Sequence, residues 1–302
     1  MTRTARLLSI ALLAAIPRAV RAQDSCGERV EPPPGFLVSA EWLRRHREDS
    51  TLVILHVERN RAPYDSAHVQ GARFIAMGDF TTKRGELLTE LPPVSQLDSL
   101  LESLGIGDRG RIVLYGEILP VTRLFFTLDY LGLGTRVSVL NGGMAAWSAA
   151  NGPETAEPAP LPPRGALTVH PRPELLADVE YVNAHRADPG VVLIDARNRE
   201  EFEGTKLEDA VARPGHIPGA RNLDWTATLS EGKFLDRAAL GQLLLNTGAN
   251  PGTEIITYCR VGTRASVVYF VGRLLGLKVR LYDGSMNEWA GRVDLPIVKG
   301  PP

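Results

Sequence analysis

The sequence predicts an α/β fold built twice, with a mostly parallel sheet and helices on both of its faces in each copy. Short apolar runs alternate with apolar stripes at helical spacing, and this strand–helix–strand alternation is typical of parallel sheets. The segment RIVLYGEILPVTRLFFTLDYLGLGTRVSVLNGGMAAW (111–147) matches EIITYCRVGTRASVVYFVGRLLGLKVRLYDGSMNEW (254–289), and 52–75 matches 191–223. We therefore expect a duplicated module of about 120 residues.

The elements are clearest in the second copy. Gly276 follows an apolar stripe at helical spacing and is expected to end that helix as a C-terminal cap. The other expected elements are buried strands at Val191–Ile194, Glu254–Tyr258 and Val279–Tyr282 and a helix at Leu235–Leu245. We expect a first domain over 36–150 and a second over 174–302. The prolines and glycines of NGPETAEPAPLPPRGALTVHPRP (151–173) predict an interdomain linker.

The N-terminus has the composition of a targeting segment. Arginines precede a short apolar run over 7–16, and small residues follow up to Ala22, which predicts a secretory signal peptide over 1–22. The apolar run is too short to span a bilayer, so we expect no stable membrane insertion after cleavage. The sequence therefore predicts an exported protein, either periplasmic or secreted.

Charge and cysteine content narrow the function classes. The net charge of the 302 residues is −1, so nothing indicates a nucleic-acid partner. The chain has two cysteines, Cys26 and Cys259. Export permits disulfides, but pairing the two would silence Cys259, so we expect Cys26 to be free or incidental.

The segment YCRVGTRAS (258–266) carries the candidate chemistry. Cys259 follows a predicted strand and precedes a predicted helix, and such strand ends border the functional crevice of parallel sheets. The loop N–H groups and the helix start are expected to form an anion-binding nest, which Gly262 allows the backbone to adopt. Arg260 and Arg264 add positive charge. This environment favours an ionised thiolate, which is a nucleophile for an anionic substrate.

The first copy has Gly116 at the position of Cys259 and Glu117, Ile118, Leu119 and Pro120 in place of the cationic loop. It keeps the pattern of the fold but cannot form a covalent intermediate. We therefore expect the first domain to be inactive and the second to be catalytic, and we expect substitution of Gly116 to matter little.

Other residues of the repeated pattern have structural or auxiliary interpretations. Asp195 closes a strand, where it either orients loop N–H groups or arginines or is a plain strand-end carboxylate. His216 matches His68 of the inactive copy, which favours a structural histidine. Trp147 and Trp289 also match and are expected to pack in the core. Asp283 and Ser285 are expected near the pocket because their strand ends at the same sheet edge.

Four motifs together resemble a known family: LIDARNREEFEG (193–204), GHIPGARN (215–222), YCRVGTRAS and YDGSMNEW (282–289). Two rhodanese-like domains in tandem, with a cysteine only in the second, are similar to the thiosulfate and 3-mercaptopyruvate sulfurtransferases. The resemblance implies that Cys259 takes a sulfane sulfur as a persulfide and passes it to cyanide, a thiol or a thioredoxin-like dithiol. It implies no metal and no organic cofactor.

The resemblance also suggests the donor. Cationic residues after the cysteine go with thiosulfate in this family, so donor binding is expected from the segment Arg260, Val261, Gly262, Thr263 and Arg264, with Arg197 and Asp195 nearby. The sequence departs from thiosulfate-specific members at Val261, where a basic residue is common, and at Glu201, where several have arginine. Arg197 or Arg199 is a candidate substitute, and 3-mercaptopyruvate stays open as the donor.

Other functions stay open. Cysteine phosphatases separate the cysteine from its arginine by five residues and usually have His before the cysteine. Here four residues separate Cys259 from Arg264, and Tyr258 precedes the cysteine. A non-enzymatic sulfur carrier is a further alternative, since the loop would also serve it. Disulfide exchange is disfavoured because no second cysteine neighbours Cys259 in the sequence.

Overall fold

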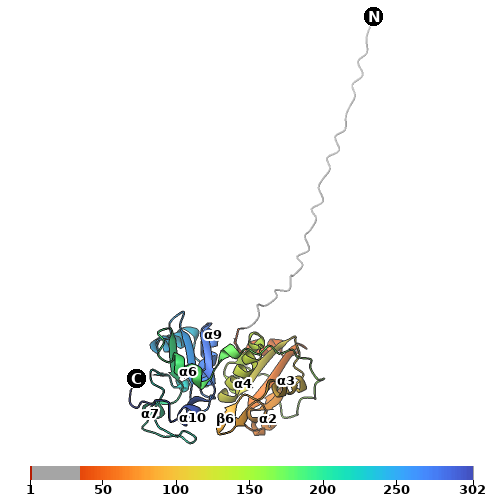
Figure 1. Cartoon of the computed structure of the whole chain (residues 1–302). Helices are drawn as coiled ribbons and strands as arrows, with labels where there is room; N and C mark the ends of the chain where they lie inside the picture. Colours follow the sequence, from red (N-terminus) through yellow and green to blue (C-terminus); the bar gives the residue numbers. More distant parts are fainter. Residues whose placement is uncertain (2–34, 302) are drawn as a thin grey trace. The chain divides into compact units, whose positions relative to one another are not determined.

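A computed structural model describes Met1 and residues 35–301; Cys26 and all but the first residue of the expected signal peptide lie outside the described residues. We call 35–150 the first half and 174–301 the second half. Each half contains a five-stranded sheet whose neighbouring strands are all parallel (Figure 1). The predicted α/β fold is thus confirmed in both copies.

The sheet of the first half has the strand order β1-β8-β7-β2-β4. Its strands are β1 (Leu37–Val38), β2 (Leu52–Glu58), β4 (Arg73–Ala76), β7 (Arg111–Gly116) and β8 (Val137–Leu140). The helices are α1 (Ala40–His46), α2 (Ala62–Ser66), α3 (Val94–Ser103), α4 (Ile118–Tyr130) and α5 (Gly143–Ala149), with 3-10 turns η1 (Met77–Asp79) and η2 (Gly134–Arg136). A separate hairpin joins β5 (Thr82–Arg84) to β6 (Leu87–Glu90).

The sheet of the second half has the equivalent order β10-β16-β15-β11-β12. Its strands are β10 (Leu176–Ala177), β11 (Val191–Asp195), β12 (Arg221–Asn222), β15 (Glu254–Tyr258) and β16 (Lys278–Tyr282). The helices are α6 (Val179–His185), α7 (Arg199–Glu203), α8 (Arg237–Asn246), α9 (Ala265–Leu275) and α10 (Ser285–Trp289), with 3-10 turns η3 (Pro173–Leu175) and η4 (Trp225–Thr228). A hairpin of β13 (Leu229–Ser230) and β14 (Lys233–Phe234) corresponds to β5–β6.

The boundaries follow from local chemistry. The helix expected over 235–245 begins two residues later, because the Asp236 carboxylate accepts a hydrogen bond from the N–H of Ala239 at 2.8 Å and caps the first turn. Gly276 ends α9 with φ +81°, as the sequence predicts. In the expected linker 151–173, β9 (Glu154–Thr155) pairs with β3 (His68–Val69) of the first half.

Helices cover both faces of each sheet. Successive residues of one strand point to opposite faces, and in β11 Leu193 packs in a cluster with α6, α7 and α10, whereas Ile194 packs in a cluster with α8 and α9. Both clusters are buried, so the strand contributes to two cores. No helix among the described residues is long and apolar enough to cross a membrane.

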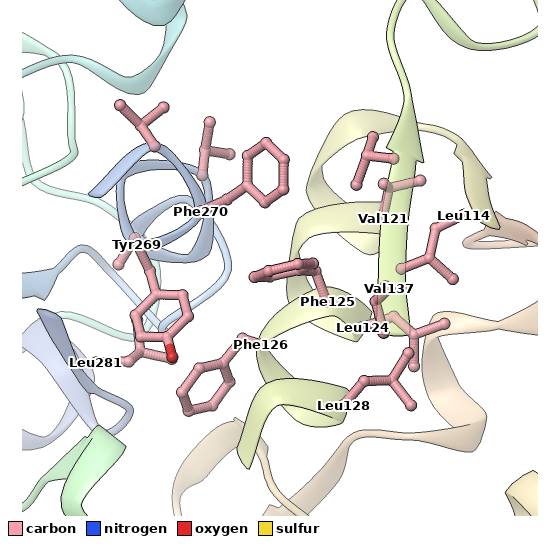
Figure 2. Packing of buried hydrophobic residues seen from close by; sticks show 14 of the residues in the cluster. Leu114, Val121, Leu124, Phe125, Phe126, Leu128, Val137, Tyr269, Phe270 and Leu281 are labelled. Atoms are coloured by element: carbon pink, nitrogen blue, oxygen red, sulfur yellow. The ribbon is translucent and has the colours of Figure 1, made fainter. Parts of the chain in front are cut away.

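One apolar core joins the two halves, because α4 and α9 pack against each other. Figure 2 shows Phe125 and Phe126 of α4 facing Tyr269 and Phe270 of α9. The ring centroids of Phe125 and Phe270 are 4.8 Å apart in an edge-to-face arrangement, and those of Phe126 and Tyr269 are 5.0 Å apart. Residues 35–301 accordingly lie within one compact unit.

Candidate active site

Cys259 lies where β15 ends, and the residues from Arg260 to Arg264 connect it to the start of α9. Its side chain is 0% exposed. We call residues 259–264 the active loop. The position at the carboxyl end of a central strand is the one that the sequence predicts.

The carbonyl groups of the first four residues of the active loop accept hydrogen bonds from partners outside it. The Cys259 carbonyl accepts from the Met286 N–H at 3.0 Å, and the Arg260 carbonyl accepts from the Asn287 N–H at 2.9 Å. The Val261 carbonyl accepts from the Thr89 hydroxyl. The Gly262 carbonyl accepts from two donors of Ser266, its N–H and its hydroxyl, both at 3.0 Å. Four consecutive carbonyls are therefore oriented by hydrogen bonds.

The backbone N–H groups of Arg260–Arg264 in the same loop, in contrast, donate to no acceptor within residues 35–301. In a trans peptide the N–H points away from the preceding carbonyl, so these donors lie on the side opposite to the bonded carbonyls. Gly262 supports this path with φ +82°, a conformation that favours glycine. The result is the expected nest of free amides, which suits an anion.

Ser285 positions the backbone of Cys259. Its hydroxyl accepts from the Cys259 N–H at 3.2 Å and donates to the Tyr282 carbonyl at 2.8 Å. Ser285 has φ +52°, and the equivalent residue of the first half is Gly143 with φ +53°. A serine thus occupies a left-handed position where the first half has glycine, the residue that tolerates it.

The two loop arginines are less available than the sequence suggests. The Arg264 guanidinium donates to Glu201 at 2.7 Å and to both oxygens of Glu208 at 2.7 and 2.8 Å. Burial disfavours its charge, but Cys259, Glu208 and Glu201 outweigh burial and raise its pKa. The Arg260 side chain is 37% exposed, with Nε 3.9 Å from Glu208. Arg264 is thus a charged arginine paired with two carboxylates, and Arg260 is the more accessible of the two loop arginines.

Asp195, which is the β-ladder partner of Tyr258, forms a buried ion pair with Arg197. The Arg197 guanidinium donates to Asp195 Oδ1 at 3.0 Å and Oδ2 at 2.6 Å, and to the Gly215 carbonyl at 2.8 Å. The structure does not bring Arg197 to an accessible surface. Arg199, the other candidate, is exposed and donates to Glu203 at 2.7 Å. Asp195 thus orients an arginine that acts as scaffold.

The matched histidines and tryptophans have matched surroundings. Nδ1 of His216 lies 2.8 Å from the Phe202 carbonyl, and Nδ1 of His68 lies 2.7 Å from the Tyr64 carbonyl; each ring stacks on the same neighbour. Trp289 and Trp147 are both fully buried. Repetition in a copy without the cysteine supports the structural interpretation.

The surroundings of Gly116 differ from the expectation that its substitution matters little. It has φ +135°, and a Cβ added there would lie 2.2 Å from the Val57 carbonyl oxygen. The expectation that substitution matters little is therefore corrected, because any side chain would clash with β2. Only Glu117 separates Gly116 from α4, so this half has no loop to form a nest. Gly116 instead lines an apolar cavity of about 330 Å³.

The first half contributes groups that the sequence did not single out. Arg123 of α4 pairs with Asp283, at 2.5 and 2.8 Å, and Thr89 contacts the active loop. The available signal is an arginine inside the apolar stripe of α4. Glu208 gives no signal in the sequence. No three His, Cys, Asp or Glu side chains of residues 35–301 converge as metal ligands.

Comparison with known proteins gives a consistent result. A model of the Rhodanese-like domain matches residues 39–150 and again 178–292. A putative thiosulfate sulfurtransferase of Haloferax volcanii is 32% identical over 285 residues, covering 87% of this chain and 96% of the relative. The thiosulfate sulfurtransferase of Pseudomonas aeruginosa is 32% identical over 240 residues, covering 78% and 87%.

Two other similarities differ in function by name. The sulfur carrier protein TtuD of Thermus thermophilus is 32% identical over 283 residues, covering 88% of this chain and 98% of that protein. The wild-type structure of EanB superposes with a TM-score of 0.79 at 24% identity, covering 88% of this chain and 70% of EanB. At that identity the structural likeness shows the fold alone.

Proposed function

Because the chain belongs to the rhodanese family and is a sulfurtransferase, we propose that it moves the sulfane sulfur of thiosulfate through a persulfide on Cys259. The observation that supports this proposal is the row of amides after the buried cysteine, which donate to no acceptor in the described part of the chain. Amides fixed in this way stabilise negative charge on sulfur before and after transfer.

The proposed steps balance without a cofactor. The Cys259 thiolate attacks the outer sulfur of thiosulfate, an S–S bond forms to Cys259, and sulfite leaves with the electron pair of the broken S–S bond. The acceptor, cyanide or a thiol such as a thioredoxin-like dithiol, then attacks the terminal sulfur, and the Cys259 thiolate is released. Arg260 is the accessible loop cation for the dianionic donor.

Replacement of Cys259 by Ser tests the proposal. We expect Cys259→Ser to keep the fold, to lose sulfur transfer from thiosulfate to cyanide, and to show no mass gain on donor exposure. The wild type should gain the mass of one sulfur atom by intact-mass spectrometry. Appreciable turnover by the variant would remove Cys259 from the mechanism. Parallel kinetics with 3-mercaptopyruvate and with p-nitrophenyl phosphate distinguish the alternative donor and a phosphatase.

A sulfur carrier is the second candidate, because TtuD bears that name at 32% identity. A carrier loads one sulfur on Cys259 but turns over slowly with small acceptors. Multiple-turnover kinetics after a single-turnover load separate the two functions.

Export is a further part of the proposal, supported by the composition of residues 1–22. N-terminal sequencing of the mature protein is expected to begin near Gln23. An intact Met1 on protein recovered from its native host would contradict export by this signal.

A further inference from the structure

Two elements of the first half contact the active loop of the second. The hydroxyl of Thr89, in β6, donates to the Val261 carbonyl. The neighbouring Leu88 N–H donates to the Asn287 side chain at 3.0 Å, and the Asn287 N–H in turn holds the Arg260 carbonyl. Figure 1 shows β6 beside α10, which carries Asn287.

Arg123 of α4 forms hydrogen bonds to residues of both halves at this contact. Its side chain is 0% exposed; it donates to both oxygens of Asp283 and, at 2.5 Å, to the Thr89 carbonyl. A Cβ added to Gly262 would lie 2.5 Å from Asp283 Oδ1 and 3.1 Å from Arg123 Nη1, so the ion pair packs directly on the loop. A buried ion pair is often no more stabilising than an apolar pair of similar volume, so stability alone does not explain it.

Within residues 35–301, this ion pair has no counterpart at the equivalent positions of the other copy. The helices α4 and α9 align at their common Leu-Gly ends, 131–132 and 275–276, which places Val267 at the position of Arg123. In the other direction, the Phe234 N–H of the second hairpin donates to the side chain of Asn141, which aligns with Asp283, at 2.9 Å. That neutral contact faces a copy without a nucleophile.

Thr89 also has an unusual backbone. Its φ is +57°, which is rare for a residue with a branched Cβ. This conformation coincides with bonds on both its carbonyl, from Arg123, and its hydroxyl, to Val261. Holding the Val261 carbonyl outward turns the Gly262 N–H, in the same peptide unit, to the opposite side.

We propose that Thr89 and Arg123 are positioning residues: the half without a nucleophile fixes the amide donors of the active loop for sulfur transfer. This inference rests on the proposed persulfide chemistry of Cys259. The first half is then a required component of the active site, although none of its residues takes part in a covalent step.

The sharpest test replaces the Thr89 hydroxyl alone. Thr89→Val keeps the branched shape, and Thr89→Ser keeps the hydroxyl. We expect Thr89→Val to slow persulfide formation from thiosulfate by about tenfold, the value of one hydrogen bond, with a melting temperature close to that of Thr89→Ser. Thr89→Ser should restore most of the rate. Asn141→Ala, which removes the neutral hairpin contact, is the matched control and should leave the rate unchanged.

Arg123→Lys and Arg123→Met extend the test, with kinetics corrected for the folded fraction. Single-turnover loading followed by intact mass separates the two levels of inference. If the wild type takes up no sulfur, the proposed function fails. If it loads sulfur and Thr89→Val loads at the same rate, or if Asn141→Ala loses as much as Thr89→Val, the positioning role is overturned.

Discussion

At the scale of single residues, Ser285 distinguishes the second half from the first as clearly as Cys259 does. Its left-handed backbone costs free energy that Gly143 avoids in the first half. The hydroxyl gained in exchange accepts a hydrogen bond from the Cys259 N–H and fixes the backbone of the proposed nucleophile. Strain that coincides with a contact to Cys259 suggests a role in the proposed function.

Replacement of Ser285 by Gly separates these two effects. Ser285→Gly relieves the backbone and removes the hydroxyl, so the free energy of unfolding should be unchanged or rise by up to about 1 kcal/mol, while persulfide formation slows by about tenfold. Ser285→Ala removes the hydroxyl without relief and should be the less stable of the two. Urea unfolding and single-turnover loading are the measurements. A Ser285→Gly variant with the wild-type rate would show that the hydroxyl is dispensable.

The sequence was informative at this scale where two copies could be compared. The contrast of Cys259 with Gly116, and the nest from Arg260 to Arg264, follow from local spacing. The pairing of Arg264 with two carboxylates does not, because Glu201 and Glu208 lie 63 and 56 residues away in the chain. Pairings over such distances depend on how loops pack, and no periodicity in the sequence reports it.

At the scale of elements, one connection distinguishes the two copies. After β7 only Glu117 precedes α4, whereas after β15 the whole active loop precedes α9. The apolar runs predicted both strands and both helices, because buried parallel strands and amphipathic helices have distinct spacings. The short hairpins β5–β6 and β13–β14 were not predicted, since two to four residues carry too little pattern.

The packing of α4 on α9 includes a buried carboxylate, and its replacement tests how much the contact between the halves stabilises the fold. Asp129 accepts from the Tyr269 hydroxyl and from Arg273 Nε, both at 2.7 Å. Asp129→Ala leaves both donors without this partner, so the free energy of unfolding should fall by about 3–5 kcal/mol in urea unfolding. Asp65→Ala, which breaks the exposed pair with Arg61, is the control and should change little. Equal losses of the free energy of unfolding in the two variants would contradict a stabilising role of Asp129 between α4 and α9.

At the scale of the whole molecule, the duplicated module folds into one unit with one active loop. The sequence predicted two domains, and it did not show that Phe125 and Phe126 serve the contact between them. Those residues fit the apolar stripe of their own helix, so their second role appears only when the other half is in place. For the same reason, the sequence did not predict the contacts that Thr89 and Arg123 make with the second half.

The contact between the halves also contains a carboxyl group that makes stability depend on pH. Glu90 of β6 is 3% exposed; burial, and then the charge of Asp283, raise its pKa to about 7, against the opposing charges of Arg84 and Arg123. The folded state therefore keeps a proton on Glu90 after the unfolded chain has lost it. As pH rises from about 4.5 to about 7, the free energy of unfolding falls, and above that range this contribution is constant.

Replacement of Glu90 by Gln, which resembles the protonated acid, tests this dependence. Urea unfolding from about pH 5 to about pH 8 should give a variant whose free energy of unfolding gains on the wild type as pH rises, with the difference levelling off above about pH 7. Burial also raises the pKa of Glu208 and Glu288 and lowers that of His216, so each curve alone mixes several groups. The difference between the two proteins isolates Glu90, because these other groups are common to both. Parallel curves would mean that Glu90 is already ionised at the lower pH, with Arg84 and Arg123 compensating its burial.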